Sequence, residues 1–213
     1  MGNLSWETIA SLATASGTLV LAIATFASVR SANRAARTAE RALQAGLRPV
    51  LMPSRLHDDP QKVYFQDRHF MVPGGCGVAA ADGDVVYLAM SIRNAGTGIA
   101  VLHGWWLSPG SIRAADQPDH APLGEFRRLT RDIYVPAGDV GFWEGALRDP
   151  DEPIYKTARA AVEAREPLTI EVLYGDHEGG QRTVTRFVLR PREDEGWLAI
   201  QSQHWNLDRP NPR

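Results

Sequence analysis

The stretch that decides the fold is residues 85–107, VVYLAMSIRNAGTGIAVLHGWWL. Its first part, Val85–Arg93, alternates large with smaller side chains, and the run that starts at Ile99 is strand-like again. Both patterns are typical of β-strands, in which successive side chains point to opposite faces. The residues between them, Asn94–Gly98, are of the types that form turns. The stretch therefore predicts two strands, Val85–Arg93 and Ile99–Leu107, joined by a turn.

Similar patterns on both sides of this stretch predict a mainly β domain over residues 48–205. Further strands are expected at Pro49–Met52, Lys62–Gln66, Val140–Gly145, Leu168–Tyr174, Thr183–Leu189 and Trp197–Gln203. Their connections are rich in turn residues, and we expect Pro73-Gly74-Gly75-Cys76-Gly77 to be a flexible loop. One helix is predicted, Ile154–Arg165, bounded by two prolines. Short strands with one short helix favour an antiparallel β-sandwich. The polar residues 206–213 are expected to be a disordered tail.

The N-terminal residues 1–29 have the pattern of a membrane anchor. Thr8–Val29 is a run of 22 residues without any charge. As a helix it would be roughly 33 Å long, enough for a hydrocarbon core of about 30 Å. The run is only modestly hydrophobic, because six residues are Ala and eight are Ser, Thr or Gly. Trp6 precedes it, where an indole would lie among the headgroups. A transmembrane helix is predicted; a buried or interfacial helix of a soluble protein is the alternative.

The charges that flank this helix predict its orientation. The N-terminal side carries Glu7 and no basic residue, whereas five arginines follow the helix: Arg30, Arg34, Arg37, Arg41 and Arg48. The positive-inside rule then places the N-terminus outside and the domain in the cytoplasm, at an inner or plasma membrane. A cleaved signal peptide would need a positively charged beginning, which this chain does not have. The single cysteine, Cys76, agrees with a cytoplasmic domain, since it has no partner for an internal disulfide.

Residues 30–47 are rich in Ala and Arg and predict a helical stalk that continues the anchor. Small residues form a seam along the predicted helix, through which two copies could associate: Ala13 and Gly17 in the membrane, and Ala32, Ala36, Ala39 and Leu43 in the stalk. A homo-oligomer is therefore one interpretation. The other is a lone stalk whose basic residues bind anionic lipid headgroups: Arg30, Arg34, Arg37 and Arg41.

Trp105 and Trp106 are adjacent residues of a predicted strand, so they must face opposite sides of the sheet. One of them can belong to the core. The other is either covered within the protein or exposed as an anchor for a protein partner.

The composition excludes several classes of function. The net charge is −2 and the pI is near 6.3, which favours no nucleic-acid partner. Arginine is far commoner than lysine, at 21 residues against Lys62 and Lys156, and we attribute this to codon usage in a GC-rich genome. The six histidines lack metal-ligand spacing, and neither glycine-rich run has the form of a phosphate-binding loop. We therefore predict no catalytic residue, no metal and no cofactor.

Four features in sequence order carry a resemblance to a known group of proteins. They are the membrane helix, the stalk that ends in Leu47-Arg48-Pro49, the strand that runs into Arg93-Asn94-Ala95-Gly96-Thr97-Gly98-Ile99-Ala100, and the late Tyr174-Gly175-Asp176 hairpin. Together they resemble uncharacterised bacterial single-pass membrane proteins with an immunoglobulin-like cytoplasmic domain. The resemblance implies an anchored immunoglobulin-like sandwich and supplies no activity. The segment Ser108–Asp139 has no counterpart in it.

The leading hypothesis is a membrane-anchored cytoplasmic β-sandwich that is not an enzyme and acts as a scaffold, adaptor or sensor by binding an unknown protein partner. An alternative is a membrane-acting effector, in which the sandwich senses a ligand and the helix oligomerises. A third is an enzyme whose metal or nucleophile is assembled from separate loops.

Overall fold

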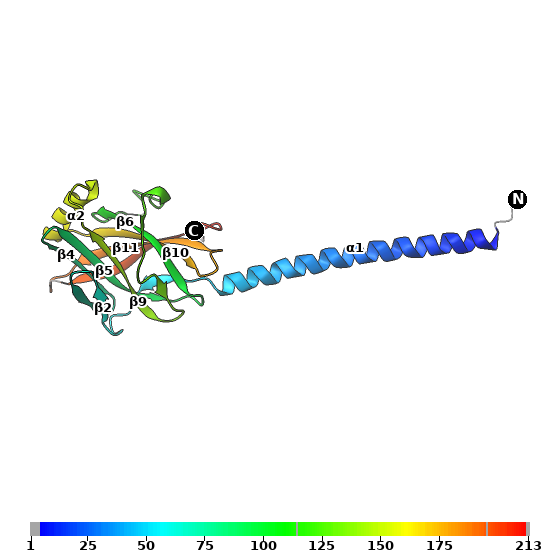
Figure 1. Cartoon of the computed structure of the whole chain (residues 1–213), viewed down its shortest axis with the longest axis horizontal. Coiled ribbons are helices and arrows are strands. Elements are labelled where there is room, and N and C mark those ends of the chain that lie inside the picture. Colours follow the sequence, from blue (N-terminus) through cyan, green and yellow to red (C-terminus); the bar gives the residue numbers. More distant parts are fainter. Residues whose placement is uncertain (1–4, 114, 195, 212–213) are drawn as a thin grey trace. The chain divides into compact units, whose positions relative to one another are not determined.

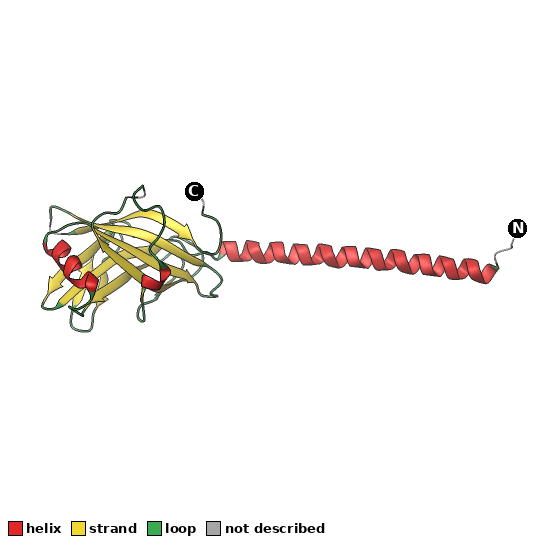
Figure 2. Cartoon of the chain, turned by 90° about the horizontal axis from the view of Figure 1, so that it is seen from above, coloured by secondary structure: helices red, strands yellow, loops and turns green. Residues whose placement is uncertain are grey.

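A computed structural model describes residues 5–113, 115–194 and 196–211, with the side chains of 44 and 45 excepted. The chain divides into two compact units, residues 1–45 and 46–213 (Figure 1). The first is helical, and the second contains all the strands (Figure 2).

Helix α1, Trp6–Gly46, is one continuous helix of 41 residues and covers both the predicted anchor and nearly all of the predicted stalk. It begins where Ser5 Oγ accepts a hydrogen bond from the Thr8 N–H at 3.4 Å, as an N-terminal cap does. Within it, Trp6–Leu43 is long and apolar enough to cross a membrane, with a mean hydropathy of 1.8 over its most apolar window. None of that window is buried inside the protein.

The second unit is built on one ten-stranded antiparallel sheet, which confirms a mainly β domain. Its strands are β1 (Leu51–Pro53), β4 (Cys76–Asp82), β5 (Val85–Asn94), β6 (Ala100–Pro109), β7 (Arg127–Arg128), β8 (Tyr134–Val135), β9 (Val140–Leu147), β10 (Leu168–Asp176), β11 (Arg182–Pro191) and β12 (Trp197–Asn206). A separate hairpin pairs β2 (Gln61–Tyr64) with β3 (His69–Val72). The helices are α2 (Pro153–Glu163) and a 3-10 turn, η1 (Leu123–Glu125).

The sheet has two arms that share one hydrophobic core. One arm contains β4, β5 and β9, the other contains β12, β11, β10 and β6, and β4 pairs with β12 only at Gly77 and Cys76. Trp105 of β6 and Trp143 of β9 lie with ring centroids 5.3 Å apart, although their strands are not paired. This contact therefore crosses the core. The immunoglobulin-like topology that the resemblance implies stays a prediction.

Strand β5 explains the alternation of large and smaller side chains in the sequence. Its large residues, such as Leu88 and Met90, face the main core. Tyr87 and the small Ala89 face a second cluster, formed with Val63 and Phe65 beneath the β2–β3 hairpin. Both faces of β5 are thus covered, and nearly every residue of the strand is buried.

Each of the eight predicted strands has a counterpart, but β3, β4, β7 and β8 were not predicted. The prediction of a flexible loop at Pro73–Gly77 was wrong in its last two residues, because Cys76 and Gly77 begin β4. At Gly77 a β-carbon would collide with the Ala89 carbonyl oxygen, 2.7 Å away, so a glycine is needed where the two backbones approach. Helix α2 ends at Glu163, before Arg165 adopts a positive φ of 53°.

The first part of the Ser108–Asp139 segment, whose role was left open, is fixed to the sheet by a buried ion pair. Arg186 of β11 and Glu171 of β10 lie 2.6 Å apart, and both side chains are fully buried. Arg186 also donates to the carbonyl oxygens of Gln117 and Asp119, at 3.0 Å each, and Glu171 accepts from the Ala121 N–H at 2.8 Å. The pair therefore fixes the segment that leads into η1 and β7.

Residues 206–211, which we expected in a disordered tail, make hydrogen bonds to the domain. The Leu207 N–H donates to the Arg182 carbonyl at 2.9 Å, and Asp208 forms an ion pair with Arg48. Asn206 is the last residue of β12, so the strand is longer than predicted. Residues 212 and 213 lie outside the described part of the chain.

Candidate functional site

The structure places Trp105 and Trp106 on opposite faces of β6, as predicted. Trp105 is buried in the main core. Trp106 is partly exposed, and its Nε1 donates to Glu125 at 3.1 Å. Each indole lines a different hollow of the surface, so the molecule has a candidate site at each of them.

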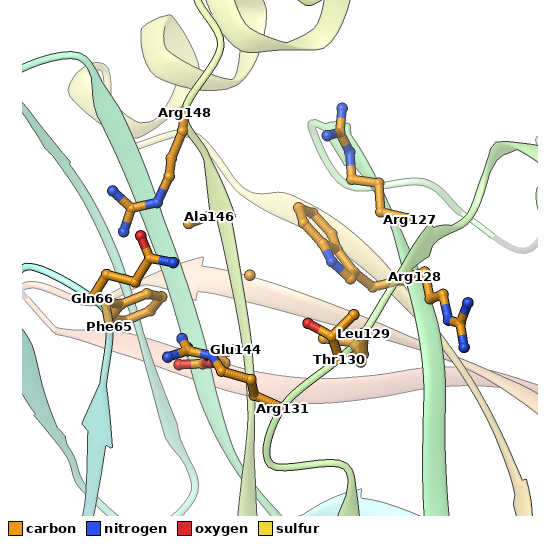
Figure 3. Close-up of a pocket in the computed structure, with 12 residues that line it drawn as sticks. Phe65, Gln66, Arg127, Arg128, Leu129, Thr130, Arg131, Glu144, Ala146 and Arg148 are labelled. Atoms are coloured by element: carbon orange, nitrogen blue, oxygen red, sulfur yellow. Dashed lines mark hydrogen bonds and ion pairs between the residues drawn. The ribbon is translucent and has the colours of Figure 1, made fainter.

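The hollow at Trp105 has a volume of about 310 Å³ and is lined by four arginines: Arg127, Arg128, Arg131 and Arg148 (Figure 3). We call it the arginine groove. On one side it is bounded by residues 127–131, and on the other by Glu144, Gly145, Ala146 and Arg148 at the end of β9; Phe65 and Gln66 complete it.

Two glycines allow this groove to form around a tryptophan. At Gly145, a β-carbon would lie 2.9 Å from the Trp105 ring, so only glycine lets the ring pack against β9. At Gly104, a β-carbon would lie 2.8 Å from the carbonyl oxygen of Arg127, so glycine also lets β7 approach β6. The Arg127 guanidinium then lies over the Trp105 ring at 5.4 Å, in the geometry of a cation–π contact.

Three of the four arginines are oriented by carboxylates. Arg148 forms a bidentate pair with Asp67, with distances of 2.8 and 3.0 Å. Arg127 is paired with Glu152 at 2.8 Å, and Arg131 with Glu144 at 2.9 Å. Arg128 is exposed and forms no ion pair with any residue that the structure describes. The four guanidinium groups are thus balanced by only three carboxylates, and Arg128 carries the uncompensated positive charge.

Glu144 is the acidic group within the groove. Its side chain is 9% exposed, and its Oε2 atom is buried without a hydrogen-bond partner among the described residues. Burial raises the pKa of Glu144, while the Arg131 charge acts in the opposite direction. Next to the groove, the hydrogen bond from Arg148 holds the pKa of Asp67 well below its usual range, with a second contribution from the Tyr87 hydroxyl. The Glu144 Oε2 atom therefore has unused hydrogen-bonding capacity beside the groove.

The hollow at Trp106 is larger, about 580 Å³, and is lined by Trp106, Leu107, Ser108, Glu125, Arg127, Pro153 and Ile154. Arg127 lines both hollows. The residues of this second hollow are mostly apolar, and none of its side chains has the buried, unsatisfied atom that distinguishes Glu144.

The residues of α1 that were predicted to associate or to bind lipid are all exposed. The small-residue seam consists of exposed residues: Ala13, Gly17, Ala32, Ala36, Ala39 and Leu43. The four stalk arginines predicted to bind lipid make no ion pair within the described chain: Arg30, Arg34, Arg37 and Arg41. Association through the seam and lipid binding both stay predictions.

Two motifs that carry the family resemblance contact each other. Asn94 Oδ1 accepts hydrogen bonds from the N–H groups of Val50 and Gly96, at 3.1 and 3.0 Å. Gly96 and Gly98 lie so close to the chain after α1 that a β-carbon would collide with the carbonyl oxygens of Arg48 and Leu47. The glycine-rich turn therefore holds Leu47-Arg48-Pro49-Val50 in place, which is a structural role.

No group of three or more His, Cys, Asp or Glu side chains that could hold a metal ion occurs in the described residues. Cys76 is buried, with Arg192 Nη1 at 3.8 Å from its sulfur. The prediction that the protein is not an enzyme is tested by neither observation and stays a prediction.

Comparisons with known proteins support no family assignment, since no family model, no curated protein and no solved structure matches this chain. The resemblance to immunoglobulin-like single-pass proteins therefore stays a prediction.

No pattern in the sequence predicted the arginine groove. We attributed the many arginines to codon usage, and the lining residues come from four separate stretches of the chain. The available signal was local: three arginines occur within the five residues 127–131, FRRLTR in context, in a protein of nearly neutral charge.

Proposed function

We propose that this protein is a single-pass membrane protein without catalytic activity, whose β-domain binds a negatively charged partner in the arginine groove. The observation that carries the proposal is the buried Glu144 Oε2 atom, which has no hydrogen-bond partner among the described residues, together with a surplus of positive charge: Arg128, at the rim of the groove, points away from Trp105 (Figure 3) and has no acidic partner among those residues. Both are polar groups whose hydrogen-bonding capacity a partner would complete.

The geometry of the groove favours binding. Its volume of about 310 Å³ falls at the lower end of the range of ligand pockets. Arg127, Arg131 and Arg148 are already held by carboxylates, so a partner need not order these long side chains itself. Guanidinium groups also form bidentate hydrogen bonds with carboxylates and phosphates, which gives them geometric specificity for anions.

This proposal is tested with the full chain in nanodiscs of neutral lipid, titrated with pyrophosphate and with hexaglutamate. Replacing Arg128 by alanine removes about 1 kcal/mol of interaction, so we expect about fivefold weaker binding of at least one of these anions. Arg190→Ala is the matched control, because Arg190 is an exposed arginine of β11 that does not line the groove. Equal affinities for all three proteins would contradict the proposal.

The proposed topology places the N-terminus outside and the domain in the cytoplasm, at an inner or plasma membrane. It is supported by the hydropathy of Trp6–Leu43 and by the arginines that follow the apolar run. Because Cys76 is buried, labelling needs exposed cysteines in a Cys76→Ala protein, one at Ser5 and one at Ala137. We expect an impermeant thiol reagent to label the first in intact cells and the second only after permeabilisation. The reverse pattern would overturn the orientation.

The alternative of a membrane-perturbing effector has less support. The hydroxyls of Thr14, Thr18 and Thr25 donate to carbonyl oxygens four residues earlier in the same helix, at 2.8 to 2.9 Å. Such hydrogen bonds satisfy the hydroxyls of a single helix in lipid, without a neighbouring helix.

A further inference from the structure

Strand β9 is an edge strand along the side that faces the arginine groove. It pairs with β5 over its whole length, from Val140 opposite Arg93 to Leu147 opposite Val86. The described residues include no second strand paired with it. In an antiparallel pair, alternate residues direct their N–H and C=O groups away from the partner strand. The part of β9 that lines the groove, Glu144–Ala146, therefore offers unpaired backbone groups to whatever occupies the groove.

The opposite side of the groove is a second free edge. Strand β7, Arg127–Arg128, is the last strand of its arm, and among the described residues it pairs with Gly104 and Trp105 of β6 alone. The groove thus lies between two strands that are not paired with each other. An extended segment of another chain could lie in it and pair with β9, as peptides do in strand addition.

The charges are distributed for an elongated ligand. In Figure 3 the guanidinium groups do not converge on one point: Arg127 and Arg128 extend to opposite sides of β7, and Arg131 and Arg148 lie at different ends of the β9 side. Arg131 is paired with Glu144, four residues before Arg148, and four residues of a strand span about 13 Å. The arginines are therefore spread along the groove and do not form a single cluster.

We propose that the arginine groove takes an extended acidic segment of a partner protein, which adds a strand to the free edge of β9. This inference rests on the proposed function and names its partner class. Acidic side chains four residues apart face Arg131 and Arg148, and the backbone of the segment pairs with that of β9. Arg128 supplies the charge that no described residue of this chain compensates, and Glu144 Oε2 accepts a hydrogen bond from a donor of the segment.

The experiment uses the full chain in neutral-lipid nanodiscs and a pool of nonapeptides with glutamate fixed at positions three and seven and the other positions randomised. A matched pool carries lysine at the same two positions. The most strongly retained acidic peptides are then remade with N-methyl groups at alternate residues, which removes backbone donors but keeps the side-chain charges.

Four results are expected. The acidic pool is retained and the lysine pool is not; Arg128→Glu weakens the retained peptides at least tenfold, while Arg190→Glu leaves them unchanged. N-methylation in one of the two registers weakens binding at least tenfold. Hydrogen exchange of the β9 amides between 141 and 147 slows at least tenfold in the complex.

The outcomes that overturn the inference are distinct. Arg128-dependent binding with unchanged β9 exchange and no effect of methylation in either register would overturn strand addition and leave the proposed function standing. If the protein bound a single-stranded polynucleotide more tightly than every acidic peptide, the partner class would be a nucleic acid and not a peptide. If no peptide, hexaglutamate or pyrophosphate bound in an Arg128-dependent way, both proposals would fail. The arginines would then be explained as charges that prevent the exposed strand edge from pairing with other chains.

Discussion

The buried ion pair between Arg186 and Glu171 is the feature whose removal has the most predictable effect. In Arg186→Met the new side chain keeps the apolar stem and loses the guanidinium. Glu171 then stays fully buried, with the Ala121 N–H as its remaining polar contact among the hydrogen bonds described above. The carbonyl oxygens of Gln117 and Asp119 also lose the donor that they share.

The expected magnitude follows from the burial of both side chains. Removing one partner of a buried ion pair costs about 3–5 kcal/mol, because the other charge is left uncompensated in the interior. We expect Arg186→Met to lower the free energy of unfolding by about 4 kcal/mol. The double variant Arg186→Met/Glu171→Leu removes both charges, and we expect it to lose only about 1–2 kcal/mol, mainly through the lost contacts with the 117–121 segment.

The assay is urea unfolding of the full chain in detergent micelles, followed by tryptophan fluorescence. The reporter is well placed, because the Trp205 ring lies 4.8 Å from the Arg186 guanidinium. Arg190→Met, at an exposed position of the same strand, is the matched control and is expected to change stability by less than about 0.5 kcal/mol. A loss below about 1 kcal/mol in Arg186→Met, or an equal loss in the single and double variants, would refute the reasoning.

Three further outcomes follow from the same structure. Gly98→Ala should cost about 1–3 kcal/mol of unfolding free energy in the same urea assay, since its β-carbon would collide with the Leu47 carbonyl oxygen; an unchanged midpoint would contradict this. Gly145→Val should displace the Trp105 ring and cost a similar amount, with a red-shifted emission spectrum as the second readout. Burial raises the pKa of Glu144 in the folded protein above its ordinary value of 4.5, so the folded state binds the carboxyl proton more tightly than the unfolded state does. The contribution of Glu144 to the free energy of unfolding therefore falls as the pH rises from about 4.5 to the raised pKa. Glu144→Gln removes this decline, so unfolding measured from pH 4 to pH 8 should show a stability difference that grows in favour of the variant over that window.

Much of the fold was accessible from the sequence because its signals are local. The uncharged run from Thr8 and the absence of proline before Pro49 predict one long helix, and the structure has it. In β5 the alternation of side chains predicts a strand, and both hydrophobic clusters use it. Strand β4 was missed because its residues, Cys-Gly-Val-Ala-Ala-Ala-Asp, have small side chains and low β-propensity. They suit the place because β4 must approach other backbones closely, which only the assembled sheet reveals.

The groove could not be predicted in the same way. The whole of β9 lies between Arg131 and Arg148 in the sequence, and Asp67, which orients Arg148, follows β2. Their proximity depends on the β2–β3 hairpin covering β5 and on the segment after β7 turning toward β9. These are tertiary contacts between residues up to 81 positions apart, which no spacing rule captures.

The way in which the 117–121 segment is fixed bears on the role of the groove that follows it. A buried ion pair adds little net stability compared with apolar residues of the same size, so Arg186 and Glu171 are poorly explained as a means of stabilising the fold. They do make hydrogen bonds that only polar groups can make, to the backbone of Gln117, Asp119 and Ala121. These bonds define the path of the chain just before η1 and β7. Guarding an exposed strand edge requires only charge nearby, whereas binding a partner requires guanidinium groups at fixed positions. Because these hydrogen bonds fix the chain that leads to the groove arginines, the structure favours binding of a partner over simple protection of the strand edge.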